Sequence, residues 1–400
     1  MSRRERLDAI VIGGAVVGAA TALALAREGF DVALVEAREP PRWRDDTADL
    51  RVYALAPDNA AMLARLGVWP AIRDARAQPY RDMRVWDAAG GAPLAIGAAA
   101  LAQPQLGWIV EHALLVDRLW AALPAAGVEL LCPATLQSLS QDERQVEAVL
   151  DVGGASRTLR ARVLIAADGG ASRARELAGI DVDAHDYGQR GLVAFVDSER
   201  PHAETCLQRF LPDGPLAFLP FVGGARPGHR HSIVWTLPDA EAARLLQAPD
   251  DVFIDALHRA SDDALGALAP ASPRAAFPLR RQLARRYLHG RVMLVGDAAH
   301  VVHPLAGQGV NLGLRDADTL VACLRETRDH RGDGVPARWQ RWARTRRSDN
   351  AAAAYAFDAI NRVFSNDALL PTLLRGPLLG LGGRVPLLPA VLARAASGFR

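Results

Sequence analysis

Short apolar runs that end in glycine or aspartate recur along the chain. Three of them, residues 8–12, 162–167 and 292–295, have the length and apolar character of buried strands. Each leads through a tight turn toward a stretch with helical character, over 21–27, from about residue 172, and beyond residue 309. Buried strands that alternate with helices are typical of an α/β fold. We therefore predict an α/β core in which three strand ends converge on one elongated ligand.

A second group of runs, within residues 186–276, is rich in shorter strands. They are predicted at 191–196, 206–211, 216–221 and 232–236, with Pro-Asp-Gly at 212–214 as a hairpin turn. These strands would form a sheet that covers the ligand. Its aromatic side chains either line an apolar pocket or belong to ordinary sheet core, and the second is the commoner case. With that alternative open, the predicted pocket residues are Phe210, Phe218 and Trp235 of this sheet, together with Tyr53 from the N-terminal part of the chain.

The first strand opens a near G-x-G-x-x-G turn at residues 13–18. A second strand follows at 30–36 and ends in Glu36, so the unit closes in roughly thirty residues. This spacing places a pyrophosphate on the helix N-terminus and a carboxylate on ribose hydroxyls. Ala15 departs from the pattern, because it stands where the middle glycine allows close approach of the phosphate. Gly13, Ala15, Gly18 and Glu36 are the predicted dinucleotide-binding residues.

The same region has a competing interpretation. Residues 9–26 carry no charge and follow Arg3, Arg4 and Arg6, as in a signal peptide or a membrane span. Cleavage of this run as a signal peptide, or its insertion into a membrane, would destroy the strand-turn-helix-strand unit whose second half contains Glu36. The glycines also suit a turn better than a span. We therefore favour the dinucleotide turn.

The strand at 292–295 enters Gly296-Asp297 and a loop with Gly307 and Gly309. Asp297 can accept hydrogen bonds from sugar-like hydroxyls, and the glycines let backbone N–H groups approach a planar ligand at a helix N-terminus. His300 and His303 lack the further ligands that a zinc site requires, so we predict no metal. The third strand ends in Asp168-Gly169 before a helix that starts near Ser172. Three such strand ends suit FAD better than NAD.

Composition narrows the function further. The 400 residues are 50% hydrophobic, which suffices for two domains and a terminal extension. A net charge of +2 gives no reason to expect nucleic acid, and the three scattered cysteines, Cys132, Cys206 and Cys323, favour a cytoplasmic location. The chain contains no lysine, which excludes a P-loop, a pyridoxal Schiff base and a kinase-type lysine. It also lacks G-x-S-x-G and H-E-x-x-H, so hydrolase mechanisms have no basis.

Several segments together resemble a known family. They are GGAVVG with Glu36, AADGGASRAR, GDAAHVVHPLAGQGVNLGLRDAD, and the shorter stretches at 49–55, 109–111, 214–220 and 364–365. The chain resembles the group A flavin monooxygenases of the para-hydroxybenzoate hydroxylase fold, and more closely the hydroxylase family of ubiquinone biosynthesis. His112 departs from the family, which commonly has Asn there.

The resemblance implies a Rossmann-like FAD-binding domain of the glutathione reductase type, with an inserted β-sheet substrate domain and a C-terminal helical extension. The expected FAD-binding domain comprises residues 1–75, 98–185 and 277–345, and the expected substrate domain comprises 76–97 and 186–276. Residues 346–400 form the expected C-terminal segment. It suits either a membrane interface or a tail packed on the FAD-binding domain, because Leu369 to Arg400 is leucine-rich and proline-rich with four arginines and no acidic residue.

The implied reaction hydroxylates the aromatic ring of a polyprenylated phenol or quinol, with NAD(P)H and O2, through a flavin C4a-hydroperoxide. In this expectation the flavin-ring loop acts mainly through its backbone, and further cofactor contacts come from both ends of the chain. The loop residues are Pro304, Gly307, Gln308 and Gly309, and the further contacts are Arg51, His112, Asp168, Asp297, Val310 and Asn311. For Arg51 a surface ion pair with Asp45, Asp46 or Asp49 is the alternative, and for His112 a structural role.

The expected partners are a hydrophobic prenylated substrate, a membrane surface and other proteins of ubiquinone biosynthesis. The location would then be cytoplasmic or peripheral to the inner membrane. Alternative functions are a related hydroxylase of a soluble phenol, a flavin reductase of the same fold, and a non-catalytic flavoprotein subunit. Substrate-dependent oxygen uptake with stoichiometric hydroxylation separates these classes.

Overall fold

The computed structural model describes residues 6–302, 308–329 and 334–364. Within these residues an eight-stranded sheet has a parallel centre in the order β19-β11-β1-β2-β8. The bounds are β19 Val292–Leu294, β11 Ala155–Ala166, β1 Leu7–Ile12, β2 Val32–Val35 and β8 Glu129–Leu131. Antiparallel strands extend it: β18 Leu288–His289 pairs with β19, and β10 Val146–Val152 joins β11 to β9 Ala134–Gln141.

The three predicted turns lie side by side at one edge of this sheet. Ile12, the last residue of β1, pairs with Ala166 at the end of β11, and Ala166 pairs with Leu294 at the end of β19. Gly13, Asp168 and Asp297 follow these strand ends by one to three residues. The predicted α/β fold and the convergence of three strand ends are therefore confirmed.

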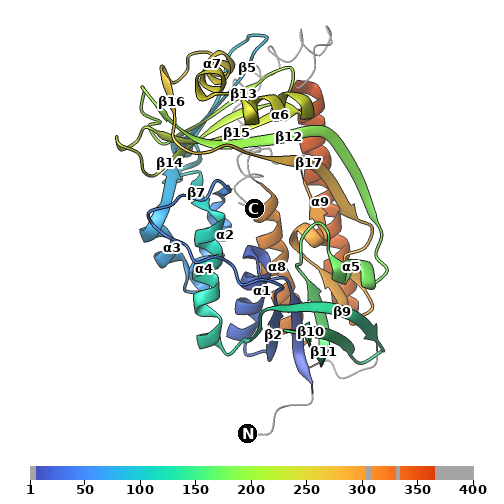
Figure 1. The fold of residues 1–400 in the computed structure, drawn as a ribbon. Helices are drawn as coiled ribbons and strands as arrows, with labels where there is room; N and C mark the ends of the chain where they lie inside the picture. Colours follow the sequence, from blue (N-terminus) through green and yellow to red (C-terminus); the bar gives the residue numbers. More distant parts are fainter. Residues whose placement is uncertain (1–5, 303–307, 330–333, 365–400) are drawn as a thin grey trace.

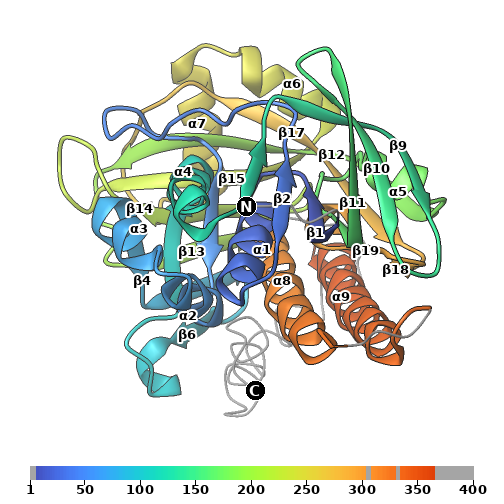
Figure 2. The ribbon, with the colours of Figure 1, turned by 90° about the horizontal axis from the view of Figure 1, so that it is seen from below.

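Helices cover this sheet. Helix α1 packs against both α4 and α8, and α9 packs along α8 (Figure 2). The bounds are α1 Val16–Arg27, α4 His112–Ala122, α8 Gln308–Glu326 and α9 Ala337–Phe364, and the short helices are α5 Arg173–Leu177, η2 Pro124–Ala126 and η3 Gly296–Ala298. Helix α1 is buried nearly all round, since it carries alanine, leucine and valine at most positions and lies beneath two other helices.

A small antiparallel sheet lies between the parallel sheet and a second large sheet. It contains β3 Val52–Leu55, β7 Gly107–Glu111 and β4 Ala77–Tyr80, in that order. Two helices follow β3, namely α2 Pro57–Arg65 and α3 Trp69–Arg76. Ala54 and Ile109 of this sheet share a core with Phe195 and Phe221 of the second large sheet.

The second large sheet has nine strands within the described residues, in the order β20-β17-β12-β15-β14-β13-β5-β6, and β16 pairs with β12. The bounds are β20 His300–Val301, β17 Ala275–Ala284, β12 Val182–Ser198, β15 Arg230–Pro238, β14 Leu216–Phe221, β13 Thr205–Phe210, β5 Asp82–Asp87, β6 Leu94–Gly97 and β16 Leu268–Pro270. The 3-10 helix η1 Ala98–Leu101 follows β6. Sequence patterning predicted four of these strands, and β12 is much longer than expected.

The second sheet has two different faces. Helices α6 Asp239–Gln247 and α7 Asp250–Ser261 lie on one face, and the parallel sheet with α1 and α8 lies on the other side (Figure 1). The long strands β12 and β17 reach from one sheet toward the other, and β17 pairs with β12 although residues from 277 onward were assigned to the FAD-binding domain. The division of the chain into domains stays a prediction.

Candidate functional site

The first turn is built so that only glycine fits at its two ends. Gly13 has φ of +99°, and a Cβ there would lie 2.4 Å from the carbonyl oxygen of Ala167. A Cβ on Gly18 would lie 1.9 Å from the carbonyl oxygen of Gly13. The chain therefore reverses directly between β1 and α1, against the end of β11.

The N-terminus of α1 is open to a ligand. Ala15 is its N-cap residue, its side chain makes no capping hydrogen bond, and the first turn holds no acidic residue. Ala15 is exposed, so its methyl group lies at the surface of the turn. Uncapped N–H groups and the helix dipole favour an anion there. The predicted departure at Ala15 thus leaves the anion-binding end of the helix accessible.

Glu36 and Trp120 hold the same turn from two sides. The backbone N–H of Gly14 donates to Oε2 of Glu36 at 2.5 Å, and Nε1 of Trp120 donates to the carbonyl oxygen of Gly14 at 2.7 Å. The backbone N–H of Arg38 donates to the other oxygen of Glu36 at 3.2 Å. The carboxylate predicted for ribose hydroxyls therefore lies at the turn. Trp120 was not predicted, and an isolated tryptophan on a helix carries no sequence signal for this contact.

Asp168 at the second turn caps helix α5. It accepts a hydrogen bond from the Ser172 hydroxyl and one from the backbone N–H of Ala174 at 3.0 Å. Arg175, also unpredicted, donates to the carbonyl oxygens of Gly170 and Ala298, both at 2.9 Å. The second turn is thereby tied to the third.

The third turn is anchored by a buried carboxylate. Asp316 on α8 has no exposed surface and accepts from the backbone N–H of Gly296 at 3.1 Å and from His300 Nε2 at 2.6 Å. Arg346 and Asn350 of α9 donate to its second oxygen at 2.8 and 3.0 Å. His300 therefore serves this network. Among the described residues no group of three or more His, Cys, Asp or Glu is arranged to hold a metal.

Asp297 presents a carboxylate at the third turn. It lies in η3 and is only partly buried, and the hydrogen bonds found for the described residues do not include its carboxylate. Its charge is close enough to contribute to the raised pKa of Tyr53, for which burial is the larger cause. An acceptor without a protein donor near a partly buried tyrosine is available to a ligand hydroxyl.

Arg51 reaches this space through an anchored loop. Glu111 is fully buried and accepts from the backbone N–H of Asp49 at 2.7 Å and from Trp43 Nε1 at 3.1 Å. Asp49 in turn accepts from the backbone N–H groups of Arg51 at 2.9 Å and Ala113 at 3.0 Å. These contacts hold the segment before β3 against the start of α4.

Arg51, Tyr53 and His112 lie together. The guanidinium carbon of Arg51 is 5.5 Å from the centre of the Tyr53 ring, and Tyr53 Oη is 3.0 Å from His112 Nδ1. Burial, and then repulsion from Arg51, lower the pKa of His112 to about 4, so its imidazole is neutral at pH 7. The ion pairs of the described residues do not include Arg51, and Asp46 pairs with Arg44 instead.

The start of α8 is described only in part. Pro304 and Gly307 lie outside the described residues, as does the side chain of Gln308. A Cβ on Gly309 would meet no atom within 4 Å, and Val310 is packed in the core. The Asn311 side chain is buried and occupied, since its Oδ1 accepts from Ala56 N–H at 2.9 Å and its Nδ2 donates to the Ala54 carbonyl at 2.8 Å. That amide joins α8 to β3 and α2, so the Asn311 side chain is engaged within the protein, and a cofactor contact at Asn311 stays a prediction.

Two predicted pocket residues lie on the wrong face of the second sheet. Phe218 and Trp235 pack with Leu245 and Phe253 of the outer helices α6 and α7, away from the three turns. The alternative of ordinary core therefore applies to both. Phe210 lies on the opposite, inward face, where it packs with Val85, Leu94 and, from α9, Phe357. Tyr53 lies beside His112 near the turns.

The inward face contains residues that the sequence did not single out. Val193 of β12 pairs with Val234 of β15, Val234 with Ala217 of β14, and Ala217 with Gln208 of β13. We call these four residues the inward row. Ala217 and Val234 remain partly exposed in the middle of the sheet, and Val193 belongs to none of the core clusters of the described residues. An apolar surface therefore faces the side on which the turns lie.

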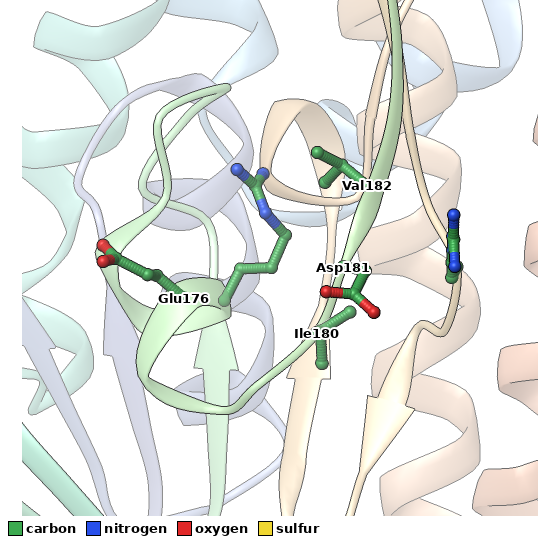
Figure 3. A pocket seen from close by; sticks show the side chains of 6 residues that line it. Glu176, Ile180, Asp181 and Val182 are labelled. Carbon is green, nitrogen blue, oxygen red and sulfur yellow. The ribbon is translucent and has the colours of Figure 1, made fainter.

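A separate pocket of about 540 Å³ lies at α5 and the start of β12 (Figure 3). Its lining is partly polar and partly apolar, and it carries both charges. Glu176 on α5 and Asp181 before β12 are shown as sticks in the figure, next to the aliphatic Ile180 and Val182. Arg175 and Arg285 complete the lining. The guanidinium of Arg175 is already bound to two carbonyl oxygens, so the pocket has no free buried polar group from this residue.

Comparison with known proteins identifies the family. The model of a family described as FAD binding domain matches residues 6–356. The chain belongs to this FAD-binding family. The ubiquinone hydroxylase UbiL of Rhodospirillum rubrum is 38% identical over 98% of this chain and 89% of its own length. The 3-demethoxyubiquinol 3-hydroxylase of Escherichia coli is 36% identical over 93% of each chain. The p-nitrophenol 4-monooxygenase PnpA of Pseudomonas putida shares the fold, with a TM-score of 0.77, 19% identity and 99% coverage of both chains.

The residues fit the cofactor of this FAD-binding family. The uncapped N-terminus of α1 suits a pyrophosphate, and the glycine turn before it brings backbone close to the ligand. Asp297 adds an acceptor without a protein donor at the neighbouring strand end. The chain is an FAD-dependent monooxygenase, for which NAD(P)H and O2 are the co-substrates of the family.

Proposed function

We propose that this flavin monooxygenase hydroxylates the aromatic ring of a polyprenylated phenol or quinol in ubiquinone biosynthesis. The observation that carries the proposal is the identity of 38% and 36%, over nearly the whole chain, to a ubiquinone hydroxylase and a 3-demethoxyubiquinol 3-hydroxylase. The apolar inward row agrees with it, because a hydrophobic ring requires a surface of this kind opposite the cofactor.

FAD, when bound, takes a hydride from NAD(P)H and activates O2. The chain itself binds the cofactor and the substrate, orients them, and excludes water. In the proposal the N-terminus of α1 binds the pyrophosphate, Glu36 accepts from ribose hydroxyls, and Asp297 accepts from the ribityl chain. The Asp316 network keeps the third turn in place beneath them.

Arg51 and His112 complete the proposed cofactor contacts. Because His112 is neutral and uses Nδ1 toward Tyr53, its Nε2 is available to the cofactor. Arg51 brings a positive charge to the same space, where it would stabilise an anionic form of the reduced ring or the pyrophosphate. Gly309 allows close approach of the cofactor at the start of α8.

The test is turnover of purified holoenzyme with 2-(3-methylbut-2-enyl)phenol, NADPH or NADH, and ¹⁸O2. The expected result is NAD(P)H oxidation that depends on the phenol and a product heavier by one ¹⁸O atom. Hydroxylation of unprenylated phenol at equal kcat/KM would favour a soluble substrate. Oxidation of NAD(P)H without any oxygen in the product would refute the hydroxylase function.

A membrane surface is the second proposed partner, because a polyprenyl chain partitions into the bilayer. Among the helices that the structure describes, none combines the length and hydropathy needed to cross a bilayer. The proposed tail, residues 369–400, lies outside the described residues. Liposome flotation of the full chain and of a chain ending at Asp367 tests the tail: equal flotation would contradict its role.

A further inference from the structure

Gln208 is a polar residue in the middle of an apolar surface. It lies on β13 between Cys206 and Phe210, which belong to core clusters on the inward face of the second sheet. Leu207, the residue before Gln208, packs on the outer face with α6 and α7. Side chains alternate along a strand, so Gln208 is directed inward, as its two neighbours at 206 and 210 are.

The Gln208 amide is buried but has no protein partner. Its exposed fraction is 9%, and the hydrogen bonds of the described residues include none from or to its side chain. Amide groups this deep in a native protein normally have a hydrogen-bond partner, so one is expected from solvent or from a ligand. Its atoms are not among those sealed from solvent, in contrast to Ser232 Oγ on the same face. A small molecule on the inward face can therefore reach the amide.

The surroundings of Gln208 define what it could bind. On either side it pairs with Ala217 of β14 and Val85 of β5, and the row continues through Val234 to Val193. None of these residues carries a charge, and the row offers no cation to a carboxylate. Burial of an unpaired carboxylate here would be strongly unfavourable. The surface suits a neutral, apolar ring with an oxygen substituent.

We propose that Gln208 hydrogen-bonds the ring oxygen of the substrate and so sets how the ring is oriented against the cofactor. The inference rests on the proposed function and names a substrate-binding residue for it. The amide can accept from a phenolic hydroxyl through Oε1 and donate to a carbonyl or ether oxygen through Nε2. A site built to pair with a hydroxyl discriminates against the same compound without it, because the amide then stays unpaired.

The experiment measures binding to oxidised holoenzyme through the change in flavin absorbance. The two probes are 2-(3-methylbut-2-enyl)phenol and 3-methylbut-2-enylbenzene, which differ only in the ring hydroxyl. The wild type should bind the phenol about tenfold more tightly than the hydrocarbon, since one well-placed hydrogen bond corresponds to about that ratio. In Gln208→Met the affinity for the phenol should be only about one- to twofold that for the hydrocarbon, with flavin content and melting temperature retained.

Leu207→Met is the matched control, since it changes the same strand on the outer face. It should keep the wild-type ratio. If Gln208→Met gives no holoenzyme, Gln208→Asn withdraws the amide by one methylene and should still lower the ratio at least about threefold.

An unchanged ratio in the Gln208 variants would overturn this inference alone. A wild type that binds both probes equally would do the same. A wild type that neither binds nor hydroxylates the phenol would refute the proposed function, and this inference with it.

Discussion

Asp316→Ala should be among the most destabilising single changes to the cofactor-binding edge. The carboxylate has no exposed surface and accepts from Gly296, His300, Arg346 and Asn350. Its removal takes the buried counter-charge from Arg346, which is only 6% exposed, and leaves it only Asp349, whose side chain is 49% exposed. Breaking a buried pair in this way costs up to about 3–5 kcal/mol. The third turn loses the anchor of its Gly296 N–H. We therefore expect that loss of stability together with a lower flavin content.

Urea denaturation followed by tryptophan fluorescence measures the stability, and the ratio of flavin to protein absorbance measures cofactor content. Asp318→Ala is the matched control on the same helix. Asp318 pairs with Arg65 at the surface, where both side chains are more than half exposed, so its loss should change stability by less than about 1 kcal/mol. A change of that small size for Asp316→Ala would refute the reasoning.

The same carboxylate predicts a pH dependence. Burial opposes its ionisation, but the attraction of His300 and then Arg346 outweighs burial and holds the pKa of Asp316 below its ordinary value of 3.8. A lowered pKa means that the stabilisation is present above the pH at which the unfolded carboxylate ionises. It is lost as the pH falls through the folded-state pKa. The free energies of unfolding of wild type and Asp316→Ala should therefore converge in strong acid. A difference between them that stays constant down to that range would contradict the pairing of Asp316 with His300 and Arg346.

Three further changes test the proposed cofactor contacts. Asp297→Ala should give folded but flavin-poor protein, and a purified variant with full yellow absorbance would rule out its role. Gly18→Ala should abolish flavin binding, because the new methyl group would lie 1.9 Å from a carbonyl oxygen, whereas Ala15→Gly should bind at least as well as wild type. The pKa of His112 is lowered from 6.5 to about 4, so between these values the unfolded state binds a proton that the folded state does not. The wild type should therefore lose stability as the pH falls from 6.5 to about 4. The urea midpoint of His112→Gln should change less with pH over that range. The same pH dependence of the midpoint in both proteins would contradict the lowered pKa.

Local sequence was a good guide to the cofactor-binding edge. The turn at Gly13 and Gly18, the acidic end at Glu36 and the Gly296-Asp297 turn are each specified within a few neighbouring residues, because tight strand-to-helix turns demand particular backbone angles and clearances. Their convergence followed from a general property of parallel sheets, in which the carboxyl ends of neighbouring strands meet at one edge. Local sequence did not indicate the links between the turns. Arg175 binds a carbonyl 123 positions away and Trp120 binds one 106 positions away.

The substrate side shows what only the tertiary structure decided. Both faces of the central strands β12, β14 and β15 are largely covered. Helices α6 and α7 cover the outer face, and the small sheet covers part of the inward face. Apolar residues therefore occupy both faces, and the alternation that marks a half-buried strand is lost. Sequence alone determined that these segments are strands with aromatic residues. It could not tell that Phe218 and Trp235 point outward while Val193, Ala217 and Gln208 point inward, since a strand's facing depends on the register set by partners far along the chain.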